Sequence, residues 1–195
     1  MNFQDDIFRC SHIWVKKENA ERVPETGVFK IKWNLYSSDD SQSTCDIKVA
    51  IQEALTLSKS ELQGIEVKTI YEKETDQFLI LTKNIVVVQI LFNLIINASH
   101  SLREQQNIKN KIHIYIQESD QYYEVYVSDN GAGVDDKLQD KIFTPFFTTK
   151  HQGTGLGLSL SKSLAKKMGG DLRLAESTIF PQGATFVASF PKTLS

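Results

Sequence analysis

The segment from Asn84 to Arg103 constrains the fold of this chain more than any other part of its sequence. It contains the run IVVVQILFNLII, residues 85–96, which is apolar on nearly all sides when arranged as a helix. A helix of this kind must be covered by other elements around its whole circumference. The apolar run is too short for a bilayer, which needs roughly 20 residues, and Gln89 and Asn93 interrupt it. We therefore predict a long, deeply buried helix at the centre of a soluble domain.

Strands and shorter helices are predicted on both sides of this segment. Residues 47–62 carry apolar side chains at helical spacing, and Asp46 is placed to cap that helix. A further helix at 156–168 ends at the pair Gly169-Gly170. Alternating patterns predict strands at 65–71, 77–82, 111–118, 122–129, 171–177 and 184–190. The fold class is therefore α+β, a two-layer sandwich in which a mixed, mostly antiparallel sheet carries helices on one face.

Residues 1–45 differ from the rest and are interpreted as an N-terminal extension of unknown role, preceding a domain at 46–195. The stretch CSHIWVKKENAERV, residues 10–23, predicts a short helix. VFKIKWNLY, residues 28–36, alternates as a strand with one buried face. A docking or dimerisation element is our interpretation, and an extra edge strand on the sheet is the alternative.

Composition and charge indicate which partners and which cellular compartment to expect. The formal net charge of -2 argues against a broad nucleic-acid surface, so no nucleic-acid partner is expected. Cys10 and Cys45 are too few for a disulfide framework and indicate free thiols in a reducing compartment. The start, MNFQDDIF, lacks the apolar run of a signal peptide. The expected location is the cytoplasm, either as a cytoplasmic protein or as the soluble part of a membrane-anchored receptor.

The string GTGLGL, residues 153–158, opens the helix at 156–168 and suggests a bound phosphate. It is not a dinucleotide-binding fingerprint, because its spacing is GxGxG and the preceding PFFTTK is not a strand. It is not a Walker A loop either, because no GK[ST] follows. Backbone amides at a helix N-terminus suit an anion. A glycine-rich hinge without a ligand is the alternative.

Asn93 and Asn97 lie one helical turn apart on the buried helix, where an amide must find partners. One interpretation is that a carboxamide oxygen coordinates Mg²⁺, a hard cation that shares oxygen ligands with phosphates. The other is a polar stripe that packs against the glycine loop.

Asp129 ends a predicted strand in the stretch SDNGAGV, just before Gly131 and Gly133. Its carboxylate is placed to accept a hydrogen bond from an exocyclic amine, while the glycines let a flat ring approach the backbone. A simple Asx turn is the alternative. Thr185, in GATF, offers a hydroxyl that we expect in the same pocket.

The order NLIINA, DNGAG, IFTPFFTTK, GTGLGL and GATF resembles the nucleotide-binding boxes of the ATP-binding catalytic domain of sensor histidine kinases. That family belongs to a wider superfamily with gyrase, Hsp90 and MutL. The resemblance covers about residues 46–192. It implies a Bergerat-type ATP-binding fold, ATP and Mg²⁺ as cofactors, and a role in two-component signalling.

The resemblance also implies residue roles. Asn97 matches the Mg²⁺ ligand and, with Lys150 at the terminal phosphate, forms the implied catalytic pair. Asp129 matches the aspartate that reads the adenine amino group. His100 stands where relatives carry a phosphate-contacting lysine, and a structural role there is the alternative. Phe143, Phe146 and Phe147 match the hinge of a mobile lid. The implied ATP-binding set is Asn93, Asn97, His100, Asp129, Gly131, Gly133, Phe143, Thr149, Lys150, Gly153, Gly155, Leu156, Gly157, Leu158 and Thr185.

One departure concerns the chemistry. ATP-hydrolysing members of the superfamily carry a water-activating glutamate where this sequence has Asn93, so we expect slow hydrolysis and favoured transfer to an acceptor. The acceptor histidine is expected outside this chain, because His113 lies in a predicted strand, His151 in the lid, and His12 lacks a following acid.

The expected partners are a phosphoacceptor histidine domain, in the same gene or in trans, and a downstream response regulator. A homodimer, if one forms, is expected through regions outside the ATP-binding domain. Two other functions stay open from the sequence: a serine/threonine kinase of the anti-sigma-factor type, and a non-catalytic ATP-binding sensor or scaffold module.

Overall fold

A computed structural model describes residues 43–71, 77–103, 109–150 and 153–192 with their side chains, and the backbone of four short strands nearer the N-terminus. The chain divides into two compact units, Met1–Ser41 and Gln42–Ser195. All of the residues predicted to bind ATP belong to the second unit.

The first unit contains strands where a short helix was expected over residues 10–23. Its strands pair as two antiparallel ribbons, β1 with β2 and β3 with β4. The sequence IWVK alternates and is rich in β-branched and aromatic residues, which favour a pleated strand over a helix. The bounds are β1 Ile7–Cys10, β2 Ile13–Lys16, β3 Ala20–Arg22 and β4 Phe29–Ile31.

The second unit is built on a five-stranded sheet with the order β10-β11-β9-β8-β6. β6 runs parallel to β8, and the remaining neighbours are antiparallel. The expected mixed, mostly antiparallel sheet is therefore confirmed. The bounds are β6 Glu66–Ile70, β8 Lys111–Glu118, β9 Tyr122–Asp129, β10 Asp171–Leu174 and β11 Ala184–Pro191.

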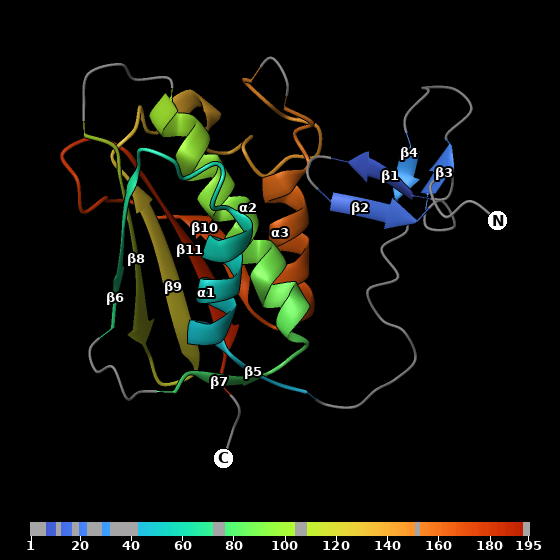
Figure 1. Ribbon diagram of the computed structural model, residues 1–195, viewed down its shortest axis with the longest axis horizontal. Coiled ribbons are helices and arrows are strands. Elements are labelled where there is room, and N and C mark those ends of the chain that lie inside the picture. The colour runs from blue at the N-terminus through green and yellow to red at the C-terminus, as the bar shows by residue number, and fades with distance from the viewer. Residues whose placement is uncertain are drawn as a thin grey trace. The chain divides into compact units, whose positions relative to one another are not determined.

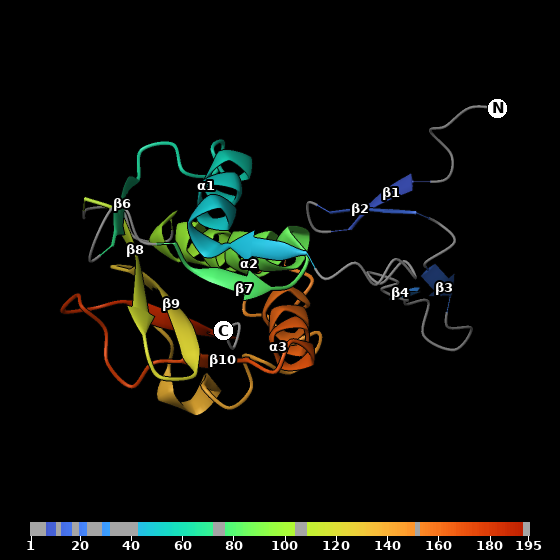
Figure 2. The same cartoon turned by 90° about the horizontal axis from the view of Figure 1, so that it is seen from below.

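Helices α1 (Ile47–Leu57), α2 (Asn84–Arg103) and α3 (Gly157–Lys167) cover one face of this sheet (Figures 1 and 2). α2 is the predicted central helix with the predicted bounds. By length and composition it qualifies as a membrane span, but 61% of that stretch is buried inside the protein, as befits a core helix. Its buried side chains are Val86, Val87, Val88, Ile90, Leu91, Leu94, Ile95, Ile96, Ala98, Ser99 and Leu102.

Local signals set the ends of the helices. Asp46 Oδ1 accepts from the backbone N–H of Lys48 at 2.9 Å, which is the expected N-cap of α1. A small antiparallel ribbon, β5 (Thr44–Asp46) with β7 (Leu79–Leu81), leads into this cap and so brings residues 44–45 into the second unit. After α3, Gly169 adopts φ +79°, the left-handed conformation that ends many helices.

Alternation along the strands decides which side chains face the helices. In β8 the buried side chains are Ile112, Ile114 and Ile116, while Tyr115 lies on the opposite face. In β9 the same alternation puts Asp129, like the buried valines before it, on the helix side. The C-terminal end of β9 therefore delivers a carboxylate to the space beside α2.

Candidate functional site

Two asparagines, Asn93 and Asn97, lie one turn apart on α2, and both are half-buried. Asn93 Nδ2 donates to Ser161 Oγ at 2.9 Å and to the Gly157 carbonyl at 3.4 Å, so this side chain faces α3. Asn97 Oδ1 instead accepts from Lys150 Nζ at 3.5 Å. The two amides share a helix face but have different partners, and Asn97 presents its oxygen to a cation.

The polar face of α2 continues beyond Asn97. His100 lies on the next turn and is half-buried. Ser101 donates through Oγ to Asp129 Oδ1 at 3.3 Å. Ser101 was not among the residues predicted from the sequence, although its four-residue spacing from Asn97 puts it on the same helix face.

Asp129 is a buried carboxylate at the end of β9, with 2% of its surface exposed. Its Oδ1 also accepts from the backbone N–H of Gly131 at 2.9 Å. Burial raises the pKa of Asp129 from 3.8 to about 6, while the hydrogen bonds and the charge of Lys150 act to lower it. A ligand N–H that bonds to this carboxylate would offset part of its desolvation cost. A buried acid with a shifted pKa beside a polar helix face is a functional-site candidate.

The glycines after Asp129 allow close approach. A Cβ on Gly131 would lie 2.2 Å from Ser101 Oγ and 2.8 Å from Asp129 Oδ1, so a side chain there would displace both groups. Gly133 lies against the Gly183 carbonyl, which a Cβ would approach to 2.9 Å. Gly131 therefore lies against Asp129 and Gly133 lies against Gly183, and their place beside a flat ring stays a prediction.

The side chain of Thr185 does not lie beside Asp129. Its backbone pairs with Ser128, one step along the strands from the pair formed by Ala184 and Asp129. Successive side chains on a strand point to opposite faces, so Thr185 lies on the sheet face turned away from the helices. There its Oγ1 lies 2.8 Å from Ser128 Oγ, and both residues are buried. The expectation that its hydroxyl joins the pocket of Asp129 is not supported.

The predicted lid segment contains the three phenylalanines and Lys150. The Phe143 ring packs edge-on to Phe186 with centroids 6.3 Å apart, and Lys162 Nζ lies 4.3 Å from the Phe143 centroid. Phe146 is 58% exposed. Thr149 is exposed, His151 lies outside the described residues, and a short 3-10 helix, Asp136–Leu138, precedes the phenylalanines. One phenylalanine thus anchors the segment to the sheet, while another faces solvent.

The glycine string forms a turn that joins the lid to α3. Phe146 has φ +67° and Gly155 has φ +66°, and the Phe146 N–H donates to the Gly155 carbonyl at 2.9 Å. α3 then begins at Gly157 with Leu156 at its N-cap position. An apolar leucine cannot accept from the first backbone N–H groups, so these donors stay available to an anion. Leu158 contributes a further amide to this first turn.

Replacing Gly155 with alanine is expected to lower the free energy of unfolding by at least about 2 kcal/mol, because the left-handed backbone alone costs about 1–2 kcal/mol. Its Cβ would also lie 2.4 Å from the Phe146 carbonyl carbon. Gly157→Ala is the contrast: its Cβ would meet only Asn93 atoms at 3.9 Å, and alanine favours a helix by up to about 1 kcal/mol. Urea unfolding of the two variants checks this, and equal midpoints would show that the turn does not form as described.

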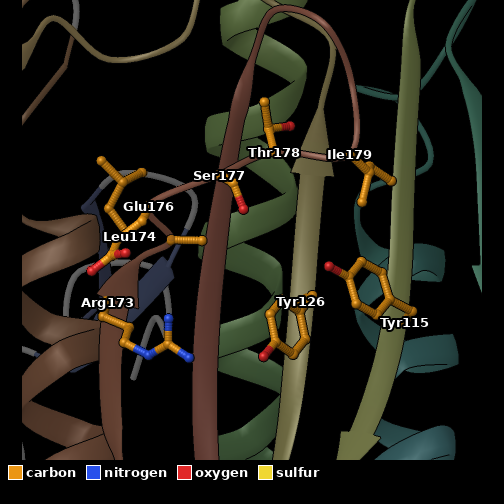
Figure 3. Close-up of a pocket in the computed structure, with 9 residues that line it drawn as sticks. Tyr115, Tyr126, Arg173, Leu174, Glu176, Ser177, Thr178 and Ile179 are labelled. Carbon is orange, nitrogen blue, oxygen red and sulfur yellow. The ribbon is translucent and has the colours of Figure 1, made fainter.

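A cavity of about 380 Å³ lies on the sheet face turned away from the helices (Figure 3). Tyr115 and Tyr126 stack there with ring centroids 4.5 Å apart, and Arg173 and the segment Leu174–Ile179 complete its wall. None of the residues predicted to bind ATP lines it. We place the candidate site on the helix side instead, because that is where the buried acid, the cation-facing amide and the open helix terminus lie.

Comparison with known proteins identifies the family of this chain. Residues 82–194 match the family of histidine kinase-, DNA gyrase B-, and HSP90-like ATPases. Signal transduction histidine-protein kinase AtoS of Escherichia coli (strain K12) is 36% identical over 147 residues, which are 74% of this chain and 23% of that protein. Sporulation kinase A of Bacillus subtilis (strain 168) is 33% identical over 139 residues, 71% of this chain and 22% of that protein. The chain therefore spans less than a quarter of the length of either relative.

Solved structures show the same fold. The catalytic domain of histidine kinase ThkA superposes with a TM-score of 0.66 at 28% identity, over 78% of this chain and 97% of that one. A mycobacterial sensor histidine kinase, MprB, gives a TM-score of 0.67 over 79% of this chain and 99% of that one, and its 19% identity supports the fold alone. The chain belongs to the histidine kinase-, DNA gyrase B- and HSP90-like ATPase family, as an ATPase domain of the sensor histidine kinase type.

Proposed function

We propose that this domain binds ATP with Mg²⁺ and transfers the γ-phosphoryl group to a histidine outside the chain. The observation that carries the proposal is the contact between Lys150 Nζ and Asn97 Oδ1, which joins the lid to α2 across 53 residues of sequence. It brings a cation to a cation-binding oxygen on α2, one helical turn from Asn93, which contacts Gly157 in the first turn of α3. A triphosphate needs these groups together.

The two ends of the nucleotide have different contacts in this proposal. Asp129 accepts a hydrogen bond from the adenine amino group, with Gly131 and Gly133 against the ring. Amides at the start of α3, from Gly157 and Leu158, donate to the phosphate oxygens. A helix N-terminus favours negative charge, because its dipole and its unpaired N–H groups act in the same direction.

The residues present fit Mg²⁺. Asn97 Oδ1 already faces a cation, the Lys150 ammonium, and an amide oxygen is a hard donor of the kind Mg²⁺ takes. Among the described residues, no group of three or more His, Cys, Asp or Glu is placed to hold a metal ion. A magnesium ion at Asn97 would therefore depend on phosphate and water oxygens for its other ligands. When bound, it would neutralise charge on the terminal phosphates.

The transfer itself depends on positioning and charge. A neutral imidazole nitrogen of the acceptor attacks the γ-phosphorus, an N–P bond forms, and the bond to the ADP oxygen breaks. Lys150 and the α3 amides stabilise the charge that develops on the phosphate oxygens. Asn93 is a neutral amide whose N–H groups face α3, so it cannot take a proton from water. We therefore propose slow hydrolysis beside faster transfer.

The acceptor and the response regulator are assigned to other domains or proteins. His113 lies in β8 with its ring centroid 4.8 Å from that of Phe180, and His100 is part of α2 beside the candidate site. His12 and His151 lie outside the described residues. Histidine kinase ThkA was crystallised with response regulator TrrA, at a TM-score of 0.62 and 24% identity to this chain. We propose an equivalent partner here, and a cytoplasmic location in which the two meet.

We expect that incubation of this domain with γ-labelled ATP and a histidine-bearing helical hairpin from a related sensor histidine kinase labels the hairpin. The label should be lost in acid and kept in base, as for phosphohistidine. The matched control is the same hairpin with its histidine replaced by glutamine, which should stay unlabelled. Acid-stable label would indicate transfer to serine or threonine, and absence of label despite ATP binding would indicate a sensor or scaffold; either outcome contradicts the proposal.

A further inference from the structure

The contact between α2 and α3 centres on Ser161, a residue that neither the sequence motifs nor the proposed chemistry uses. Ser161 lies on α3 one turn after Gly157 and is fully buried, with 0% of its surface exposed. Its Oγ accepts from Asn93 Nδ2 at 2.9 Å. The same nitrogen lies 3.4 Å from the Gly157 carbonyl, so one amide contacts both ends of the first α3 turn.

The direction of these hydrogen bonds limits what Asn93 does. A carboxamide nitrogen carries two N–H donors, and the two acceptors that Asn93 Nδ2 contacts, Ser161 Oγ and the Gly157 carbonyl oxygen, belong to α3. The nitrogen of Asn93 is therefore engaged within the protein. Buried amide–hydroxyl contacts of this kind hold two elements in one arrangement, because a lost partner leaves a buried donor unsatisfied.

We propose that Ser161 is a positioning residue which, through Asn93, fixes the first turn of α3 relative to Asn97. Asn93 and Asn97 lie on the same helix face, so the contact with Ser161 sets the separation between the α3 amides and the amide oxygen of Asn97. A triphosphate that spans the two needs this separation to be constant. The inference rests on the proposed function, and it assigns to Asn93 a structural contact with α3 in place of a direct contact with nucleotide.

The inference predicts which part of the ligand is affected. Adenosine contacts the Asp129 end of the site and has no phosphate. Ser161→Ala should therefore weaken ATP about five- to tenfold, the effect expected for one buried hydrogen bond, and change adenosine affinity less than about twofold. Calorimetry with both ligands in the presence of Mg²⁺ measures the two effects on the same protein.

The matched control is Ser163→Ala. Ser163 lies on α3 two residues further on, is exposed, and donates to the Ser159 carbonyl of its own helix at 3.0 Å. The same hydroxyl is removed, but nothing that connects α3 to α2 is lost. Both affinities are expected to stay at the level of the parent protein.

A double-mutant cycle separates positioning from direct contact. If Asn93 acts through Ser161, then the double variant Asn93→Ala with Ser161→Ala should weaken ATP no more than Asn93→Ala does alone. Asn93→Ala should itself be equal to Ser161→Ala or only slightly weaker in ATP binding, because it also loses the long 3.4 Å contact with the Gly157 carbonyl. A much larger loss in Asn93→Ala would mean that Asn93 contacts the nucleotide itself, and would overturn the inference. Loss of adenosine binding in Ser161→Ala would indicate a misfolded protein. Asn93→Ala, which leaves the sequence of α3 intact, then decides: it should weaken ATP while adenosine affinity stays within about twofold, and an unchanged ATP affinity would overturn the inference.

The two proposals fail in different ways. If the parent binds ATP no better than adenosine, the proposed phosphate site is rejected, and the inference falls with it. If the parent prefers ATP but Ser161→Ala binds both ligands as the parent does, only the inference is overturned.

Discussion

Replacement of Asp129 by asparagine is expected to weaken ATP binding about 10- to 100-fold, the cost of losing one charge-assisted hydrogen bond. In the proposed site the carboxylate accepts a hydrogen bond from the adenine amino group, whereas an asparagine amide can turn its own N–H groups toward the base. Guanine carries a carbonyl at that position, so GTP affinity should stay level or rise. Calorimetric titration of the parent and the variant with both nucleotides gives the ratio directly.

The same substitution is expected to stabilise the free protein above pH 6. The pKa of Asp129 is about 6 in the folded protein and 3.8 as the ordinary value, so the folded state holds the proton more tightly. The stability from this group is present in full below about pH 4 and is lost as pH rises through about 6. The shift corresponds to roughly 3 kcal/mol as an upper figure, so we expect Asp129→Asn to gain on the order of 1–3 kcal/mol at pH 8 and little at pH 4.

Chemical unfolding at pH 4 and pH 8 measures this difference, and Asp120→Asn is the matched control. Asp120 is exposed in the turn between β8 and β9. Asp120→Asn therefore removes the same charge from a carboxylate that folding does not bury. A stability gain that is equal at the two pH values would show that the Asp129 carboxylate is not the destabilising group. Equal binding of ATP and GTP by the parent would remove its role in adenine recognition.

Replacement of Asn97 by alanine is expected to weaken Mg²⁺-dependent ATP binding about 10- to 100-fold. The variant loses the oxygen proposed to bind Mg²⁺, and it also loses the acceptor of Lys150 Nζ. In the presence of EDTA the ATP affinity of the parent should fall toward that of the variant, since the metal then contributes to binding in neither protein. The measurement is calorimetric titration with ATP, with and without Mg²⁺.

Asn84→Ala tests the same side-chain truncation at the other end of α2. Asn84 is the first residue of α2, and its Nδ2 donates to Glu53 Oε2 at 2.7 Å. Its loss should leave ATP affinity and metal dependence unchanged. If Asn97→Ala kept the full gain in affinity from Mg²⁺, the assignment of the metal to this amide would be contradicted.

Elements with a regular pattern were predicted closely from the sequence. The bounds of α2, β8 and β9 agree with their hydrophobic periods, because each period follows from burial on one face or on all sides. The secondary structure of the N-terminal segment was harder to predict. Residues 10–23 combine helix-favouring charged residues with the strand-favouring IWVK, and short segments of that kind are decided by pairing with a neighbour.

Thr185 shows how a single step changes a site. The sequence placed its hydroxyl beside Asp129, but the register pairs Asp129 with Ala184 and turns Thr185 to the other face. A shift of one residue exchanges the two faces of a strand, and no local pattern distinguishes the neighbouring positions when both are buried.

The sequence by itself determined which segments are buried and that Asp46 caps α1, and it predicted which glycines and polar residues form the proposed nucleotide site. Only the tertiary structure decided which side chains meet. Ser101 reaches Asp129 over 28 residues, Lys150 reaches Asn97 over 53, and Asn93 reaches Ser161 over 68. Those contacts depend on strand register and on the rotation of α2 and α3 about their axes. Both are set by packing of the whole core, which no local stretch of sequence contains.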